Sequence, residues 1–123
     1  MPDLLTHVLA GYTLATALRV RFDWLSPAYV TVCMAGTLLP DTAKLYLVVP
    51  DAAVATLLAV PFSWHVLHTL GGVVVAVSAG GVLARRVDRL RVAGLLSLGA
   101  VSHLAADGLL LTGSGHSKPM LWP

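Results

Sequence analysis

The stretch VAGLLSLGAVSHLAADGLLL, residues 92–111, decides the fold class, because it is an apolar run of 20 residues that contains a histidine and an aspartate. A helix of this length rises about 30 Å, which is the thickness of the hydrocarbon core of a bilayer. A second apolar run of 20 residues, 65–84, precedes it. The two runs predict two membrane-spanning helices.

The composition of the whole chain is typical of an integral membrane protein. Of its 123 residues, 57% are hydrophobic and 11% are charged, and the mean hydropathy is +0.82. A soluble domain of this size cannot bury so much apolar surface. The net charge of +2 is a small excess in a charge-poor chain, so nucleic-acid binding is not expected. The first residues lack a basic region and a cleavage site, so we expect the first helix to stay in the mature protein.

Three further apolar runs are shorter. Runs 4–18 and 25–39 hold 15 residues each. As helices they would measure about 22 Å and would span the membrane only with snorkelling ends or a thinned bilayer. In run 45–60, Pro50 and Asp51 indicate a helix start, and Pro61 follows as a stop. The remaining ten or so residues, at about 1.5 Å each, cannot cross, so we expect an interfacial or re-entrant helix.

The arginines decide between four spans and the alternative of five, in which 45–60 is one crossing helix. All six lie after the first run or between the last two: Arg19, Arg21, Arg85, Arg86, Arg89 and Arg91. Four spans place both groups on one face, which the positive-inside rule makes cytoplasmic. The sequence therefore predicts one all-α membrane domain over 1–123, a small bundle of about four spanning helices plus one short interfacial or re-entrant helix. Its five histidines, together with Asp41 and Asp107, fall toward the non-cytoplasmic face.

Small residues recur every four positions along the run 65–84, at Gly72, Ala76, Gly80 and Ala84. Such a stripe lets another helix approach closely in a membrane. The approaching helix can belong to the same chain or to a second copy, so the stripe also permits a homo-oligomer.

The strongest chemical signal is the pair His103 and Asp107, which stand one turn apart on one helix face. Both side chains can reach one metal ion, or the aspartate can orient a ligating histidine. The alternative is a buried histidine that bonds to the aspartate only for helix packing. Ionisable residues inside a membrane are costly and usually functional, which favours the metal.

The other candidates are weaker on spacing alone. His65 and His68 open the run 65–84 three residues apart, and either can be a ligand. Asp41 follows a proline and is most simply a turn residue. His7 lies in the first helical turn, where an isolated histidine is often interfacial. His116 lies in a glycine-rich loop and is the weakest candidate.

Five histidines with Asp41 and Asp107 form an imidazole and carboxylate set that suits zinc or manganese. The set exceeds the needs of one tetrahedral zinc, so one or two ions are expected. A single cysteine, Cys33, excludes a thiolate cluster. Because no nucleophile motif or phosphate-binding loop is present, hydrolysis would use metal-activated water.

The order of these motifs resembles the YdjM-like family of membrane-bound, metal-dependent hydrolases. The likeness rests on four motifs and on the closing PMLWP, and it covers nearly the whole chain: Thr6-His7 with Gly11, Leu39-Pro40-Asp41, His68, and Ser102-His103 with Asp107. The resemblance implies that the metal ligands are His7, Asp41, His68, His103 and Asp107. His65 and His116 are additional candidates, and Asp41 or Asp107 is expected to act as the catalytic base.

These inferences predict a hydrolase that cleaves a phosphoester, such as a phospholipid or a lipid-linked substrate, near the non-cytoplasmic face. Lys44 or Lys118 would attract the anionic headgroup. Two other functions stay open. One is ion or proton transport through the bundle, and the other is a non-catalytic membrane scaffold with a structural metal.

Overall fold

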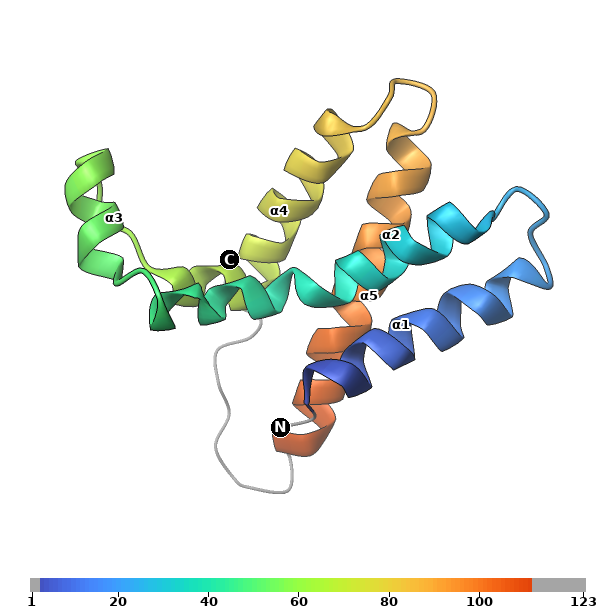
Figure 1. Cartoon of the computed structure of the whole chain (residues 1–123), viewed down its shortest axis with the longest axis horizontal. Coiled ribbons are helices and arrows are strands. Elements are labelled where there is room, and N and C mark those ends of the chain that lie inside the picture. Colours follow the sequence, from blue (N-terminus) through green and yellow to red (C-terminus); the bar gives the residue numbers. More distant parts are fainter. Residues whose placement is uncertain (1–2, 112–123) are drawn as a thin grey trace.

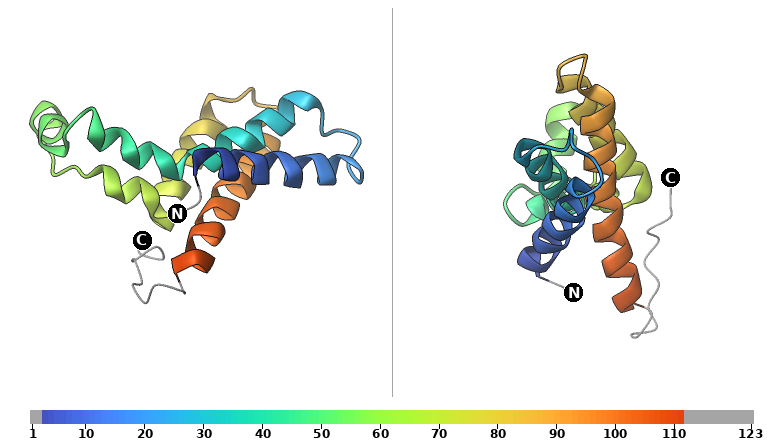
Figure 2. Two further views of the ribbon diagram at one scale, coloured as in Figure 1. Left: turned by 60° about the horizontal axis from the view of Figure 1, so that its bottom comes forward. Right: turned by 90° about the vertical axis from the view of Figure 1, so that its right-hand side faces the viewer.

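The computed structural model describes residues 3–111, which fold into helices without any strand (Figure 1). In chain order the elements are α1 (Leu4–Arg19), α2 (Pro27–Leu38), η1 (Pro40–Leu47), α3 (Asp51–Leu58), η2 (Trp64–His68), α4 (Leu70–Leu83) and α5 (Arg89–Leu111), where η marks a 3₁₀ helix. Helices α1 and α2 form one hairpin and α4 and α5 another, and the two hairpins cross (Figure 2). The predicted all-α class is confirmed for the described part of the chain.

Helix α1 begins at a capping residue. The Oδ1 atom of Asp3 accepts hydrogen bonds from the backbone N–H of Thr6 at 2.8 Å and from its hydroxyl at 2.7 Å. Aspartate is a preferred N-cap because its side chain satisfies a backbone donor that the helix leaves free.

This cap makes the first turn of α1 sensitive to acid. The Thr6 hydroxyl, and then the Thr6 N–H, stabilise the carboxylate and lower the pKa of Asp3 below its ordinary value of 3.8. Because the lowered pKa belongs to the folded chain, the stabilisation is present above about pH 4 and is lost as the pH falls through that lowered pKa. We expect carbon NMR to show a lower titration midpoint for Asp3 in the wild type than in a Thr6→Ala variant. Equal midpoints would contradict the capping contact.

Helices α2 and α5 cross at two glycines. A Cβ atom on Gly36 would lie 2.5 Å from the carbonyl oxygen of Leu96 and 2.8 Å from its Cα, and one on Gly99 would overlap the carbonyl oxygen of Cys33. The two backbones therefore approach as closely as small residues permit. Apolar side chains fill the space on either side of the crossing: Ala15, Leu25, Val30, Cys33 and Leu95 on one side, and Val73, Val77, Leu96 and Ala100 on the other.

The run 65–84 is not one helix, which corrects the prediction of a 20-residue span. Thr69 has extended backbone angles, φ −105° and ψ 163°, and its hydroxyl accepts the N–H of Gly72 at 3.2 Å. This N-cap starts α4 at Leu70 and leaves only 14 residues, or about 21 Å of helix. Gly72 also permits η2 to pack closely, because a Cβ there would overlap the carbonyl oxygen of Val66.

Helix α5 confirms that residues 92–111 form one continuous helix, which begins three residues earlier. Its segment Arg89–Leu109 is the one helix of the described part that is long and apolar enough to cross a membrane unaided. Helices α2 and α4 are apolar but shorter, at 12 and 14 residues. The arrangement of four spans therefore stays a prediction.

Between the hairpins, η1, α3 and η2 form an arm (Figure 1). The expected short helix is confirmed as α3, which has eight residues, follows Pro50 and buries none of its side chains. The segments of chain before and after α3 lie close together in the arm. The indole N–H of Trp64 donates to the carbonyl of Val49 at 2.8 Å, and the backbone N–H of Trp64 donates to Asp51 at 3.3 Å.

The small-residue stripe of α4 is occupied partly within the chain. A Cβ on Gly80 would lie 2.6 Å from a methyl group of Leu96 in α5, and Gly72 faces η2. A homo-oligomer through the rest of the stripe, including Ala76 and Ala84, stays a prediction.

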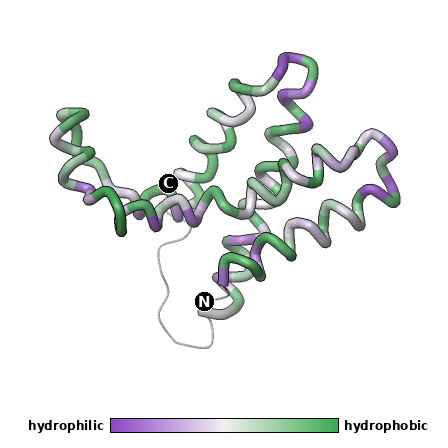
Figure 3. The backbone as a smooth tube through the Cα atoms, viewed as in Figure 1, coloured by the Kyte–Doolittle hydropathy of each residue, from purple (hydrophilic) through white to green (hydrophobic). Residues whose placement is uncertain are grey.

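The two arginine-bearing turns are neighbours. Tyr29, at the start of α2, donates its hydroxyl to Asp88 at 2.7 Å, and the Arg91 guanidinium lies 5.1 Å from the centre of the Trp24 ring. Figure 3 shows hydrophilic residues at these two turns and again where η1 and η2 meet α5. The charged and polar groups thus lie in two separate regions of a largely apolar molecule.

Candidate metal centre

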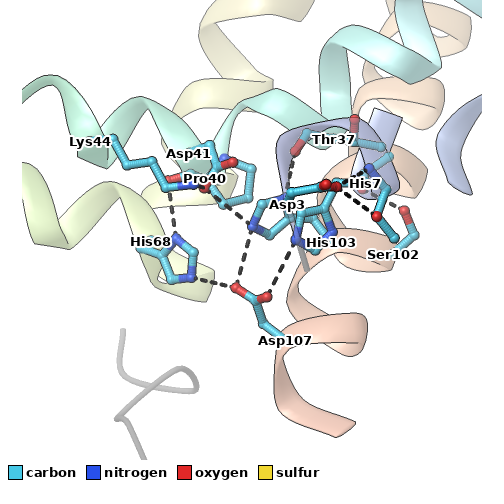
Figure 4. A network of polar contacts seen from close by, with 12 residues as sticks. Asp3, His7, Thr37, Pro40, Asp41, Lys44, His68, Ser102, His103 and Asp107 are labelled. Carbon is cyan, nitrogen blue, oxygen red and sulfur yellow. Dashed lines mark hydrogen bonds and ion pairs between the residues drawn. The ribbon is translucent and has the colours of Figure 1, made fainter. Parts of the chain in front are cut away.

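Four elements bring five ionisable side chains together where the arm joins the crossed hairpins (Figure 4). His7 comes from the first turns of α1, Asp41 from η1 and His68 from η2. His103 and Asp107 lie one turn apart on α5. These are the five residues that the family resemblance implies as ligands, although 100 residues separate the first from the last.

The cluster holds nearly all the buried polar side chains of the described residues. His7 is 2% exposed, Asp41 8%, His103 1% and Asp107 2%, and the only other buried polar residue there is Thr37. Burial of ionisable groups is costly unless they are paired or bind a cation. The buried polar side chains of the described residues are therefore concentrated in this cluster.

Asp107 lies at the centre of the cluster. Its Oδ1 is 3.4 Å from Nε2 of His7, and its Oδ2 is 3.1 Å from Nε2 of His68 and 3.5 Å from Nε2 of His103. Asp41 Oδ1 lies 3.7 Å from the same His103 nitrogen. The ligand atoms of a tetrahedral zinc, with bonds of about 2.0–2.1 Å, lie about 3.3 Å apart. The spacing thus matches a metal site.

Two backbone carbonyls fix the histidine tautomers. His103 Nδ1 lies 2.7 Å from the carbonyl oxygen of Thr37, and His68 Nδ1 lies 3.1 Å from that of Pro40. A carbonyl oxygen only accepts, so each Nδ1 carries a proton, and Nε2 is the ring atom that faces the cluster. Metal-binding histidines are typically held in this way.

Pro40 explains why the Thr37 carbonyl is available. After Leu38 the chain tightens from an α-helix to a 3₁₀ helix, whose bonds join each carbonyl to the N–H three residues later. For Thr37 that residue is Pro40, which has no N–H. The carbonyl therefore turns to the ring of His103.

Three buried atoms of the cluster have no hydrogen-bond partner among the described residues: Asp41 Oδ2, His103 Nε2 and Asp107 Oδ1. All three are electron-pair donors. Such atoms repel one another in a medium of low polarity unless a cation lies between them. The residues present therefore fit a metal ion.

The donors form two overlapping groups, His7 with His103 and Asp107, and Asp41 with His68 and His103. Within each group the ligand atoms lie within 4.8 Å of one another, and His103 belongs to both. The rings of His7 and His103 stack with their centres 3.8 Å apart.

Lys44 lies at the edge of the cluster. Its Nζ is 2.8 Å from Asp41 Oδ1, and its side chain is 52% exposed. His68, at 16%, has the most exposed side chain of the five clustered residues. The cluster is thus closed on the α5 side and reached from the side of η1 and η2.

The structure does not bring every candidate to the cluster. His65 is exposed and packs its ring on Tyr46, with centres 5.2 Å apart. His116 and Lys118 lie outside the described residues. Sequence analysis did not identify the carbonyls of Thr37 and Pro40 as partners of the histidines, although the position of Pro40, three residues after Thr37, is the feature that leaves the Thr37 carbonyl available.

Comparison of the chain with protein-family models, curated proteins and solved structures finds no match in any of the three. The chemistry is therefore assessed on the donor set alone. Imidazole nitrogens with carboxylate oxygens suit divalent cations such as zinc and manganese.

Proposed function

We propose that the chain is a membrane-bound, metal-dependent hydrolase that cleaves phosphoesters, similar to the YdjM-like family. The observation that carries this proposal is the convergence of three buried atoms that lack a hydrogen-bond partner with two imidazoles whose Nδ1 atoms are held by backbone carbonyls. Structural packing alone gives no reason to bury unpaired lone pairs, because each costs free energy.

The proposed ligands are His7, His68, His103 and Asp107, with Asp41 beside them. A divalent metal bound there lowers the pKa of water toward about 7 and neutralises charge on a phosphoryl oxygen. Asp41 is the better placed of the two candidate bases, because its Oδ2 has no hydrogen-bond partner and its Oδ1 lies beside the exposed Lys44. Asp107 is held at the centre by three histidines and serves to ligate and to orient them.

An apolar outer surface supports a membrane location. The exposed positions of α4 include Val74 at 57%, Val75 at 67%, Val82 at 65% and Leu83 at 88%. A soluble helix carries polar residues on such a face. We place the arginine-bearing turns on the cytoplasmic side and the cluster toward the other face, where a phospholipid or lipid-linked headgroup can reach it.

The proposal is tested by turnover. Purified protein in detergent, loaded with zinc or manganese, is incubated with bis(p-nitrophenyl) phosphate and with a short-chain phospholipid. We expect metal-dependent release of product that is lost in an Asp41→Asn variant which keeps its metal. Metal-loaded protein that turns over neither substrate class would contradict the hydrolase.

Lys44 provides a further prediction about the substrate. Because its ammonium lies 2.8 Å from Asp41 and reaches solvent, it is placed to attract an anionic phosphate. We expect Lys44→Met to raise KM about tenfold, equal to about 1.4 kcal/mol, without loss of metal. Lys44→Arg, which keeps the charge, should restore most of the affinity. An unchanged KM in Lys44→Met would remove the lysine from substrate binding.

A structural metal is the second candidate, and the burial of His103 at 1% and Asp107 at 2% favours it. Structural zinc sites are closed, whereas catalytic sites keep a position open to water. This alternative predicts that metal raises the Tm of the protein but supports no turnover. Measurement of the Tm with and without metal, beside the turnover assay, therefore separates the two functions.

A further inference from the structure

A second feature lies at the arginine-bearing end of the molecule, away from the metal cluster. Side chains from the end of α1, from the turn before α2 and from the first half of α5 enclose an open groove of about 460 Å³. The volume falls within the range of about 300–1,000 Å³ that is usual for small-molecule sites. Arg91 and His103 are twelve positions apart on α5, or about 18 Å, so the groove is a separate site.

The groove is apolar along its length and positive at its rim. Leu25 and Leu95, which are 2% and 5% exposed, form buried parts of its lining, while Leu18 and Leu98 also line it. Arg91 is the one charged residue of the lining, and its guanidinium lies over the ring of Trp24. This cation–π contact holds the charge at the rim.

The positive charge at this end is not neutralised within residues 3–111. None of the six arginines lies within salt-bridge distance of a carboxylate there, since the ion pairs of this part involve only Lys44 and the clustered histidines. Asp88 instead accepts the hydroxyl of Tyr29. Arg89 donates to the carbonyls of Val82 and Ala84. An unpaired cation beside an apolar groove is complementary to a molecule with an anionic head and an aliphatic tail.

We propose that the groove binds one anionic phospholipid, with an acyl chain along the leucines and the phosphate at Arg91. The proposal rests on the membrane location proposed above, and it is independent of the hydrolase chemistry. Arginine binds phosphate through several parallel N–H donors, and basic pockets between helices on the cytoplasmic side commonly hold anionic headgroups. A second protein chain is a poorer occupant, because it would have to supply both an aliphatic ridge and a carboxylate at the right spacing.

Trp24 is a built-in reporter for this site. Substitution of the other two tryptophans, Trp64→Phe and Trp122→Phe, leaves Trp24 as the only one. The protein in detergent is titrated with phosphatidylglycerol carrying a brominated acyl chain, and separately with phosphatidylcholine carrying the same chain. We expect half-maximal quenching of Trp24 at an at least fivefold lower mole fraction of phosphatidylglycerol.

Three variants locate the effect. Arg91→Gln should abolish the preference for phosphatidylglycerol over phosphatidylcholine. Arg85→Gln, in the turn that precedes α5 and outside the groove, should keep it. Gly94→Leu should weaken quenching by both lipids, because nothing lies within 4 Å of a Cβ at Gly94 and a leucine would fill the groove without a clash. Metal content, measured on every variant, shows that the fold is kept and reports on the other site independently.

Three outcomes would overturn the proposal. Equal quenching by both lipids would show that Trp24 contacts ordinary boundary lipid and that the groove does not select an anionic headgroup. Absence of quenching, together with a dimer in solution, means that a second copy covers the groove. A preference for phosphatidylglycerol that Arg85→Gln reduces as much as Arg91→Gln means that general charge, and not the groove, selects the lipid.

Discussion

Replacement of His103 by alanine is expected to remove the bound metal ion from the purified protein. His103 belongs to both donor groups, its Nε2 faces Asp41 and Asp107, and its ring is 1% exposed. Loss of an outer partner of a metal ligand already costs about 10–100-fold in affinity, so loss of the ligand itself should cost more than about 100-fold. Elemental analysis should show at least one equivalent of transition metal in the wild type and a small fraction of that in His103→Ala.

The chain offers a matched control for this experiment. His65 is also a histidine of η2, but it is exposed and lies outside the cluster, so His65→Ala should keep its metal. Asp107→Asn keeps the size of the side chain and removes its charge, which separates loss of a ligand from loss of packing. A wild-type protein without stoichiometric transition metal, or a His103→Ala variant with unchanged metal, would remove the basis of the metal centre.

Local sequence rules were enough for some of the structure. The prolines at positions 50 and 61 delimit α3 because proline begins helices well and ends them. The spacing of His103 and Asp107 places both on one face because four residues make about one helical turn. In each case the deciding contacts lie within a few residues of one another.

Other features depend on contacts that hydropathy does not detect. The run 65–84 is apolar throughout, yet it divides at Thr69, because this residue caps α4 and Gly72 lets η2 pack against the cap. A mean hydropathy taken over 20 residues hardly changes with one threonine, so it does not detect the division.

The same limit applies to the site. On local spacing Asp41 is a turn residue and His7 an interfacial one, and each becomes part of the cluster only because α1, η1 and α5 meet in space. The four-motif resemblance identified them because it compares their order along the whole chain and does not depend on local geometry. Nothing comparable in the sequence pointed to the carbonyls that orient the histidines.

The close crossing of α2 and α5 predicts a large destabilisation when Gly99 is changed to leucine. Even the Cβ atom would overlap the carbonyl oxygen of Cys33 and lie 2.7 Å from the backbone nitrogen of Thr37. Backbone cannot move aside as a side chain can, so the helices must separate, and overpacking of this kind costs about 1–3 kcal/mol or more. Thermal unfolding in detergent should show a clearly lower Tm than in the wild type.

Gly94→Ala is the control, because it lies on the same helix and a Cβ there meets nothing within 4 Å. Its Tm should stay near the wild-type value. The two glycines also differ in their link to the site, since Gly99 packs beside Thr37, whose carbonyl orients His103. Separation of the helices should therefore weaken metal binding in Gly99→Leu and leave it intact in Gly94→Ala. A stable Gly99→Leu variant with a full metal complement would show that the crossing does not position the histidine, and the orientation of His103 would then need another cause.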